Sequence, residues 1–352
     1  MTNRPVPAGL DQKITALLTH AGVDAKPDQL TTCTQGANNR TYRVDTKAGA
    51  FAVKQYFRHD DDTRDRLATE FSFLTYAHQA APGMSPRPLA CDAMSGITLC
   101  EFIEGQPFQT GNIGATEVGA ALHFFRSLNR APSELACDLP VAADACFTIT
   151  DHIALVDARV SRLLDATSSD ATDFDASRFV RRLSTVWKKV SEQALSEAEL
   201  LGLDANAALL HIQRCISPSD FGFHNALRAS DGTIRFLDFE YAGWDDPAKT
   251  AGDFFQQLAV PVPPQYRQHF ATEIARCLHD PTATLARIEL LRPVYAVKWC
   301  CIVLNIYLPV HLARRRFATP SLDESALKRS QLTKAIAILE SLNSTTTQSG
   351  DH

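Results

Sequence analysis

The chain has 352 residues, of which 45% are hydrophobic and 21% are charged. These fractions are typical of globular proteins and exclude a wholly disordered chain, while the length favours two domains or lobes. With 35 basic and 40 acidic residues, the formal net charge is −5. Such a charge, without a long basic run, argues against nucleic acid as a partner.

The cysteines and the apolar segments indicate the compartment. The nine cysteines are an odd number and contain no Cys-x-x-Cys pair, whereas a secreted disulfide framework favours even counts and a zinc site favours paired spacing. The most apolar segment, residues 295–310, is interrupted by Lys298, Asn305 and Pro309. It is too short to span a bilayer and predicts a buried helix. We therefore expect reduced, mostly buried thiols in a cytoplasmic protein without a membrane partner.

The first hundred residues carry mostly strand signals. Residues 41–45 and 50–56 are short β-prone runs joined by a turn, and residues 97–102 form another such run. Between them, apolar side chains recur at helical spacing over residues 62–80, and an aspartate stands at the start of this segment as a candidate cap. This part of the chain therefore predicts a small sheet with one helix.

After a linker-like break at residues 104–107, the periodicity becomes helical for most of the chain. One strand-rich island, residues 209–239, interrupts the helices, and Asp231-Gly232 within it is a strong hairpin signal. The predicted amphipathic helices are residues 118–128, 152–164, 177–203, 265–278 and 321–342.

These elements predict an α+β fold with two lobes. We expect a small β-rich N-terminal lobe over residues 1–104, which ends in a hinge. A larger, mostly helical C-terminal lobe follows over residues 105–340 and carries the hairpin. The Ser/Thr-rich residues 341–352 are expected to form a disordered tail.

The predicted hairpin carries the clearest chemical signal. Asp220 and Asn225 stand five residues apart before it, and Asp238 follows its second strand. Because a hairpin brings its two ends together, we expect these three side chains to converge at its mouth. An Asn and an Asp are oxygen ligands and suit Mg²⁺ better than Zn²⁺. The remaining carboxylate, Asp220, can then orient a hydroxyl group and accept its proton.

This order of residues is the phosphoryl-transfer arrangement of kinases, and its other parts are expected upstream. Lys54 lies late in the second predicted strand, where it can reach the phosphates of ATP, and Glu70 follows in the predicted helix, where it can hold Lys54 in place. The turn before the first strand contains Asn38 and Asn39. Its backbone N–H groups and short polar side chains can cover phosphates.

At these motifs the sequence resembles the aminoglycoside phosphotransferase and choline kinase-like superfamily. The resemblance runs in register over residues 34–254 and includes the segment 101–105, Glu-Phe-Ile-Glu-Gly, and the segment 244–247, Trp-Asp-Asp-Pro. It implies a protein-kinase-like fold and ATP-dependent, Mg²⁺-dependent phosphorylation of a small-molecule hydroxyl group. The acceptor stays open among amino alcohols, aminoglycosides, homoserine and sugars.

The resemblance also implies a role for each matched residue. Asp220 would be the catalytic base, and Asn225 and Asp238 would be the metal ligands. The backbone from Glu101 to Ile103 would contact adenine. Asp246 and Asp253 would be structural acids that brace the catalytic loop.

One position departs from the family pattern. The family usually has a His two residues before the catalytic Asp, and here that position is Pro218. Pro218 therefore motivates a competing hypothesis, a catalytically impaired pseudokinase that acts as a nucleotide-binding or scaffold protein. His224 lies inside the same loop, and we expect it to be a packed or capping residue rather than a catalytic one. A protein kinase is disfavoured, because Asp238 is followed by Phe-Glu and Asp246-Pro247 arrives too soon for a peptide-docking activation segment.

Overall fold

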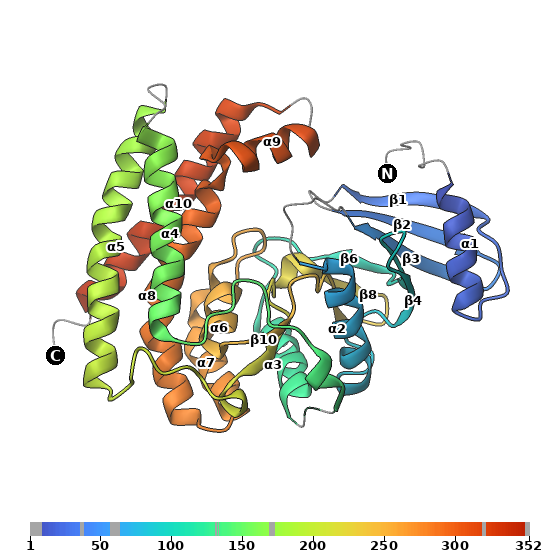
Figure 1. Ribbon diagram of the computed structural model, residues 1–352, viewed down its shortest axis with the longest axis horizontal. Helices are drawn as coiled ribbons and strands as arrows, with labels where there is room; N and C mark the ends of the chain where they lie inside the picture. The colour runs from blue at the N-terminus through green and yellow to red at the C-terminus, as the bar shows by residue number, and fades with distance from the viewer. Residues whose placement is uncertain are drawn as a thin grey trace. The chain divides into compact units, whose positions relative to one another are not determined.

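The structure is a computed structural model (Figure 1), and it describes residues 9–35, 39–56, 64–130, 132, 134–168, 173–318 and 322–348. The chain divides into two compact units. Unit 1 comprises residues 1–143, 216–244 and 259–263, and unit 2 comprises residues 144–215, 245–258 and 264–352. These units do not coincide with the segments 1–104 and 105–340, and the lobe boundary after residue 104 stays a prediction.

Unit 1 contains a five-stranded antiparallel sheet with the strand order β1-β2-β3-β5-β4. The sequence folds this way because β2 alternates, with Tyr42 and Val44 buried on one side, and Val53 of β3 is buried opposite Tyr42. The strands are β1 (Gln29–Gln35), β2 (Asn39–Thr46), β3 (Gly49–Tyr56), β4 (Pro88–Asp92) and β5 (Ile97–Glu101).

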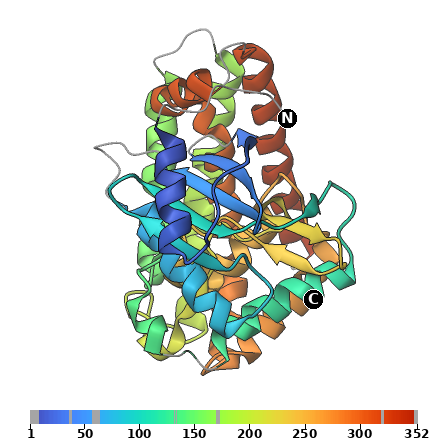
Figure 2. The ribbon, with the colours of Figure 1, turned by 90° about the vertical axis from the view of Figure 1, so that its right-hand side faces the viewer.

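Helix α1 (Leu10–His20) packs on one face of this sheet (Figures 1 and 2). Its apolar residues recur at helical spacing, and Ile14 and Leu18 are completely buried in a core shared with Val44 and Leu99. This core fixes the sheet that carries Lys54.

Helix α2 (Arg66–Ala80) begins later than the predicted residue 62. Asp65 has an extended backbone and accepts a hydrogen bond from the backbone N–H of Ala68 at 2.9 Å, which is the geometry of an N-cap. The aspartates at the predicted start lie outside the described residues. α2 buries Glu70 and Phe73, so a carboxylate lies on the buried side of this helix.

The predicted hairpin is confirmed. β8 (Ala226–Ala229) pairs with β9 (Ile234–Phe236), and Gly232 has φ of +82° in the turn, a conformation that glycine adopts without strain. The predicted linker at residues 104–107 instead contains a third strand, β6 (Gly105–Pro107), which pairs with β8. Gly105 is required there, because a Cβ atom would lie 2.8 Å from the carbonyl oxygen of Arg228.

Helix α3 (Ala115–Asn129) anchors the segment that leads to Asp220. The side chain of Asn129 accepts a hydrogen bond from the N–H of Ile216 at 2.7 Å and donates one to its carbonyl oxygen at 3.0 Å. Ile216 lies in β7 (Cys215–Ser217), which pairs with β10 (Gly243–Asp245). The start of the segment that leads to Asp220 is therefore held by a buried amide.

Unit 2 consists mainly of helices, as the periodicity predicts. α4 and α5 pack side by side (Figure 1). Helix α10 continues past the predicted start of the tail at residue 341. The helices are α4 (Ile149–Ser168), α5 (Phe174–Leu200), α6 (Pro247–Gln256), α7 (Arg267–Arg276), α8 (Pro281–Val303), α9 (Pro309–Ala318) and α10 (Glu324–Gln348).

The apolar segment is longer than predicted. Residues 281–307 are long and apolar enough to cross a membrane, but 67% of the most apolar window is buried inside the protein. Arg287 and Lys298 within this segment are buried in ion pairs with aspartates. These features are typical of a core helix. The predicted buried helix is confirmed as far as Val303, whereas residues 304–307 form a 3₁₀ segment and Val310 is an exposed residue of α9.

Asp246 and Asp253 are held inside unit 2. Asp246 caps α6, and its carboxylate accepts a hydrogen bond from Arg287 at 2.7 Å and contacts His152 at 3.0 Å. Burial alone raises the pKa of Asp246, but Arg287 and His152 outweigh it and lower the pKa to about 2. Asp253 is bonded to Lys298 at 3.0 Å. Bracing of the catalytic loop by these acids stays a prediction.

All nine cysteines lie within the described ranges, and none of them forms a disulfide. Five are buried, namely Cys100, Cys146, Cys215, Cys300 and Cys301. Burial raises the pKa of Cys100 and Cys146 to about 12, so these thiols are protonated and unreactive at neutral pH. This agrees with the predicted role of most cysteines as core residues.

Candidate active site

The predicted pair of Lys54 and Glu70 is present in unit 1. Lys54 lies on β3 and Glu70 lies on α2, and the Lys54 Nζ atom is 2.5 Å from Glu70 Oε2. The hydroxyl group of Tyr56, two residues after Lys54, donates a hydrogen bond to the same oxygen at 2.7 Å. Residues that are two apart on a strand point to the same side, so β3 presents both donors to one buried carboxylate.

Asp238 joins this pair. Lys54 Nζ lies 2.5 Å from Asp238 Oδ1, so the ammonium group bridges two carboxylates. The backbone of Asp238 has φ of +65°, a left-handed conformation that Asp tolerates better than most residues. Its neighbours hold it there: the N–H of Leu237 donates to the carbonyl oxygen of Asn225 at 2.8 Å, and the ring centroid of Phe239 lies 4.7 Å from that of Phe73.

The charges of this cluster are strongly coupled. Burial alone would lower the pKa of Lys54, but the carboxylates of Glu70, Asp238 and Glu240 outweigh it and raise the pKa well above its usual range. Burial raises the pKa of Glu70, and the opposite charge of Lys54 works against that increase. Lys54 is therefore a permanent cation placed among carboxylates.

Glu240 was missed as a site residue by the sequence reasoning. Its carboxylate is buried, accepts a hydrogen bond from Asn39 Nδ2, and lies 3.4 Å from Arg66 Nη1. One oxygen from each of Glu70, Asp238 and Glu240 lies within 4.8 Å of the others. In the sequence, the only signal for Glu240 is that an acidic residue stands two positions after Asp238.

The predicted catalytic loop brings Asp220 and Asn225 together. Asn225 Nδ2 donates hydrogen bonds to the carbonyl oxygen of Asp220 at 3.0 Å and to its Oδ2 at 3.2 Å. His224 Nε2 lies 3.2 Å from Oδ1 of the same carboxylate. The Asp220 side chain is 44% exposed, so a substrate can reach it.

The chemistry of Asn225 and Asp238 fits a magnesium ion. Asn225 uses its amide nitrogen for Asp220, which leaves the amide oxygen Oδ1 as its metal-type ligand. Asp238 uses Oδ1 for Lys54 and retains Oδ2. Both ligands are oxygens, as Mg²⁺ prefers. The nearby carboxylates of Glu70 and Glu240 add to the negative charge.

The expected nucleotide contacts are only partly described. Asn38 lies outside the described residues, and Asn39 is the first residue of β2, where its side chain binds Glu240. Glu101 ends β5, and its N–H donates to the carbonyl oxygen of Arg87 at 2.9 Å. Ile103 follows in an irregular, half-buried segment. The proposed contact of this segment with adenine stays a prediction.

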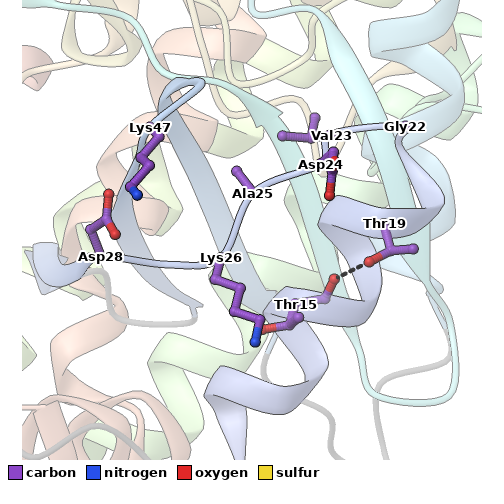
Figure 3. Close-up of a pocket in the computed structure, with 9 residues that line it drawn as sticks. All are labelled: Thr15, Thr19, Gly22, Val23, Asp24, Ala25, Lys26, Asp28 and Lys47. Carbon is purple, nitrogen blue, oxygen red and sulfur yellow. Dashed lines mark hydrogen bonds between the residues drawn. The ribbon is translucent and has the colours of Figure 1, made fainter.

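A separate surface pocket of about 630 Å³ lies in unit 1 between α1, the segment before β1 and the β2–β3 turn (Figure 3). Its side chains include two aspartates and two lysines at its rim. None of the predicted site residues lines it. The lining residues are Thr15, Thr19, Gly22, Val23, Asp24, Ala25, Lys26, Asp28 and Lys47.

The fold combines an antiparallel sheet that carries a Lys–Glu ion pair with a loop that contains Asp220 and Asn225, a hairpin, and Asp238 after it. This arrangement is that of a kinase-like phosphotransferase fold. The comparisons with known proteins identify the family. The model of the phosphotransferase enzyme family matches residues 29–279, which is more than half of the chain. The protein therefore belongs to the phosphotransferase enzyme family.

Solved structures of similar fold include kinases of small molecules. A spectinomycin phosphotransferase in complex with ADP and spectinomycin is 14% identical, with a TM-score of 0.60 and coverage of 95% of this chain and 99% of that chain. Choline kinase from Cryptosporidium parvum is 13% identical, with a TM-score of 0.56 and 90% coverage of each chain. Choline kinase LicA from Streptococcus pneumoniae is 13% identical, with a TM-score of 0.57 and coverage of 95% and 100%. These likenesses confirm the kinase-like fold. No curated protein matches the chain.

Proposed function

We propose that the protein transfers the γ-phosphate of ATP, with Mg²⁺, to a hydroxyl group of a small molecule. Amino alcohols, aminoglycosides, homoserine and sugars are the acceptor classes that we consider. The observation that carries the proposal is the position of Lys54, whose ammonium group bridges Glu70 and Asp238 at 2.5 Å each. The buried Lys249 also contacts two aspartates, but the Asp238 side chain beside Lys54 is 44% exposed, so a ligand can reach this cluster.

Each site residue has a role in this proposal. Lys54 binds the α- and β-phosphates when they enter, and Glu70 and Tyr56 keep its ammonium group in position. Asn225 and Asp238 supply oxygen ligands for Mg²⁺, which neutralises phosphate charge when it is bound. Asp220 orients the acceptor hydroxyl group and takes its proton.

Nucleotide binding is assigned to the N-terminal part of the chain. The backbone from Glu101 to Ile103 would hold adenine, and Asn38 and Asn39 would contribute to the phosphate site. Support comes from the spectinomycin phosphotransferase, which was solved with ADP and spectinomycin. We further propose that the protein acts in the cytoplasm, with neither nucleic acid nor membrane as a partner.

The competing proposal is a nucleotide-binding scaffold without phosphoryl transfer, which Pro218 favours because it replaces a residue that usually supports the catalytic loop. The two proposals differ in one measurable product. A phosphotransferase forms ADP in the presence of the correct hydroxyl compound, whereas a scaffold binds ATP and forms none.

The test is a coupled ADP-release screen over a panel of hydroxyl metabolites and aminoglycosides, with Mg·ATP as donor. We expect at least one acceptor to stimulate ADP formation and to gain phosphate. Asp220→Ala should then lower turnover by about 10²–10⁴ with little change in ATP affinity, since positioned base catalysis contributes about that much. Asp11→Ala, which changes an exposed residue on α1, is the matched control. ATP binding without ADP formation from any acceptor would favour the scaffold.

A further inference from the structure

The strongest further observation concerns His224, which the sequence predicts to be a packed or capping residue. Its Nε2 atom lies 3.2 Å from Asp220 Oδ1, and its side chain is only 19% exposed. We propose that His224 is a positioning residue that orients the carboxylate of Asp220 for phosphoryl transfer. This inference rests on the proposed function, since it assigns a role in the same site.

The direction of the hydrogen bond follows from the chemistry of the two groups. An ionised carboxylate can only accept hydrogen bonds, so the contact requires the proton of the imidazole to be on Nε2. The other ring nitrogen, Nδ1, is buried and has no hydrogen-bond partner among the described residues. The polar contact that His224 makes through its ring is therefore directed at Asp220.

Both oxygens of Asp220 are held from the same short segment. His224 contacts Oδ1 at 3.2 Å, and Asn225 Nδ2 donates to Oδ2 at 3.2 Å. Two donors on the two oxygens fix the plane of the carboxylate, whereas one donor leaves rotation about the Cβ–Cγ bond. Both distances lie at the long end of the range for hydrogen bonds.

Hydrogen bonds and packing hold the backbone of this loop in place. The 3₁₀ turn Phe223–Asn225 carries His224, and the N–H of Asn225 donates to the carbonyl oxygen of Gly222 at 3.1 Å. Phe223, the residue before His224, is completely buried, and its ring centroid lies 6.2 Å from that of Phe236 and 5.3 Å from that of Phe108. This packing fixes the start of the His224 side chain relative to Asp220.

Pro218 cannot donate a hydrogen bond to Asp220. Pro218 has neither a backbone N–H nor a polar side chain, and the N–H of Ser219 is used by the hydroxyl group of Ser217 at 3.0 Å. His224 and Asn225 both contact the carboxylate of Asp220 from its C-terminal side.

The test compares Gln and Asn at position 224, two amide side chains that differ in length. The side-chain nitrogen of Gln can occupy the position of the His Nε2 atom, whereas the shorter Asn places its nitrogen near the position of Nδ1. We therefore expect His224→Gln to retain kcat within about threefold. His224→Asn and His224→Leu should each lose about 10- to 100-fold in kcat, because a small misplacement of a reacting group has an effect of that order. The assay uses Mg·ATP with the acceptor found in the screen, or with water as acceptor.

Three further measurements separate positioning from loss of structure. KM for ATP, the affinity for Mg·ATP by calorimetry and the melting temperature should stay close to wild type in the Gln and Asn variants. His123→Leu, at an exposed position of α3, should leave all parameters unchanged. A fall in kcat that is matched by an equal loss of Mg·ATP affinity would show a merely structural role and overturn the proposal.

The outcomes also separate this inference from the proposed function. An active wild type with equal kcat in the Gln and Asn variants would overturn the role of His224 alone. A wild-type protein that binds Mg·ATP and forms no ADP with any acceptor would overturn the phosphotransferase proposal and, with it, the role of His224.

Discussion

Removing Lys54 should expose how strongly the acidic cluster depends on its one bridging cation. In Lys54→Met, the buried carboxylates of Glu70 and Glu240 and the half-exposed Asp238 remain within 4.8 Å of one another without Lys54. Breaking a buried ion pair by removing one partner typically destabilises a protein by about 3–5 kcal/mol. We expect about 3 kcal/mol at pH 8, because exposure of Asp238 screens part of the repulsion.

Glu70→Gln should be milder, because Lys54 keeps its contact with Asp238 at 2.5 Å. We expect the single variant to lose about 1–2 kcal/mol. The double variant should be less destabilised than the sum of the two single variants by about 2 kcal/mol, since the second change removes a charge that the first left uncompensated. The loss in kcat/KM should follow the same pattern, because Glu70 acts on phosphate through Lys54.

The stability loss of Lys54→Met should depend on pH in a defined direction. Burial already raises the pKa of Glu70 in the fold, and removal of Lys54 raises it further. A carboxyl group with a raised pKa binds a proton more tightly in the folded than in the unfolded state, so the folded state gains stability as the pH falls through that pKa. The deficit of Lys54→Met relative to wild type should therefore shrink from pH 8 to pH 5.5.

Urea unfolding followed by circular dichroism at both pH values measures these quantities. Lys47→Met, at an exposed position of the β2–β3 turn, serves as the control and should behave as wild type. If the double variant loses as much free energy of unfolding as the two single variants together, Lys54 and Glu70 act independently. The interpretation of the cluster would then be wrong.

Three other changes test the metal site, the buried acids and the packing of unit 2. Asp238→Asn should weaken Mg·ATP binding in calorimetry far more than binding of metal-free adenosine, and equal losses would contradict its role as a metal ligand. Asp246→Asn should lower the free energy of unfolding by about 2.5 kcal/mol at pH 7. Most of this difference should disappear as the pH falls from about 4 to 2, because the folded pKa of Asp246 is lowered to about 2. An undiminished difference at pH 2 would contradict the ion pairing. Gly252→Ala should destabilise by about 1–3 kcal/mol, since its Cβ would lie 2.5 Å from Cγ of Tyr295. Gly119→Ala on α3, where no atom lies within 4 Å of the added Cβ, is the control for Gly252→Ala and should be neutral or stabilising when both are compared by urea unfolding.

The Lys54–Glu70 pair could be predicted from sequence because the order strand, Lys, helix, Glu is preserved by chain connectivity. β3 and α2 are each regular, and a buried carboxylate on α2 has few cationic partners available. The start of α2 was placed too early because several aspartates precede it, and only backbone geometry selects Asp65 as the cap. The order of residues along the chain therefore predicts that β3 and α2 meet, whereas local backbone geometry decides where α2 begins.

The contacts of Glu240 and His224 could not be predicted by the same route. Asn39 and Glu240 are 201 positions apart in sequence, and no spacing rule relates a turn residue to an acid after a distant hairpin. His224 lies four residues after Asp220, a spacing that brings side chains together only in a helix. Here the chain turns at Asp220, where Phe221 N–H donates to the carbonyl oxygen of Ser219 at 2.7 Å, and turns again in the 3₁₀ segment Phe223–Asn225. Such turns are specified by packing rather than by periodicity.

The neighbours of Pro218 determine how it affects the loop before Asp220. A proline removes one N–H donor and fixes φ, so it harms a loop only where that donor or another φ value is required. Ser217 accepts the next N–H, from Ser219, and Ser219 takes φ of +65°, which turns the chain toward Asp220. Such a left-handed residue costs about 1–2 kcal/mol and persists only where the surroundings fix it. The loop is thus shaped by Ser217, Pro218 and Ser219 and oriented at its other end by His224, which is a different way of supporting Asp220 rather than a loss of support.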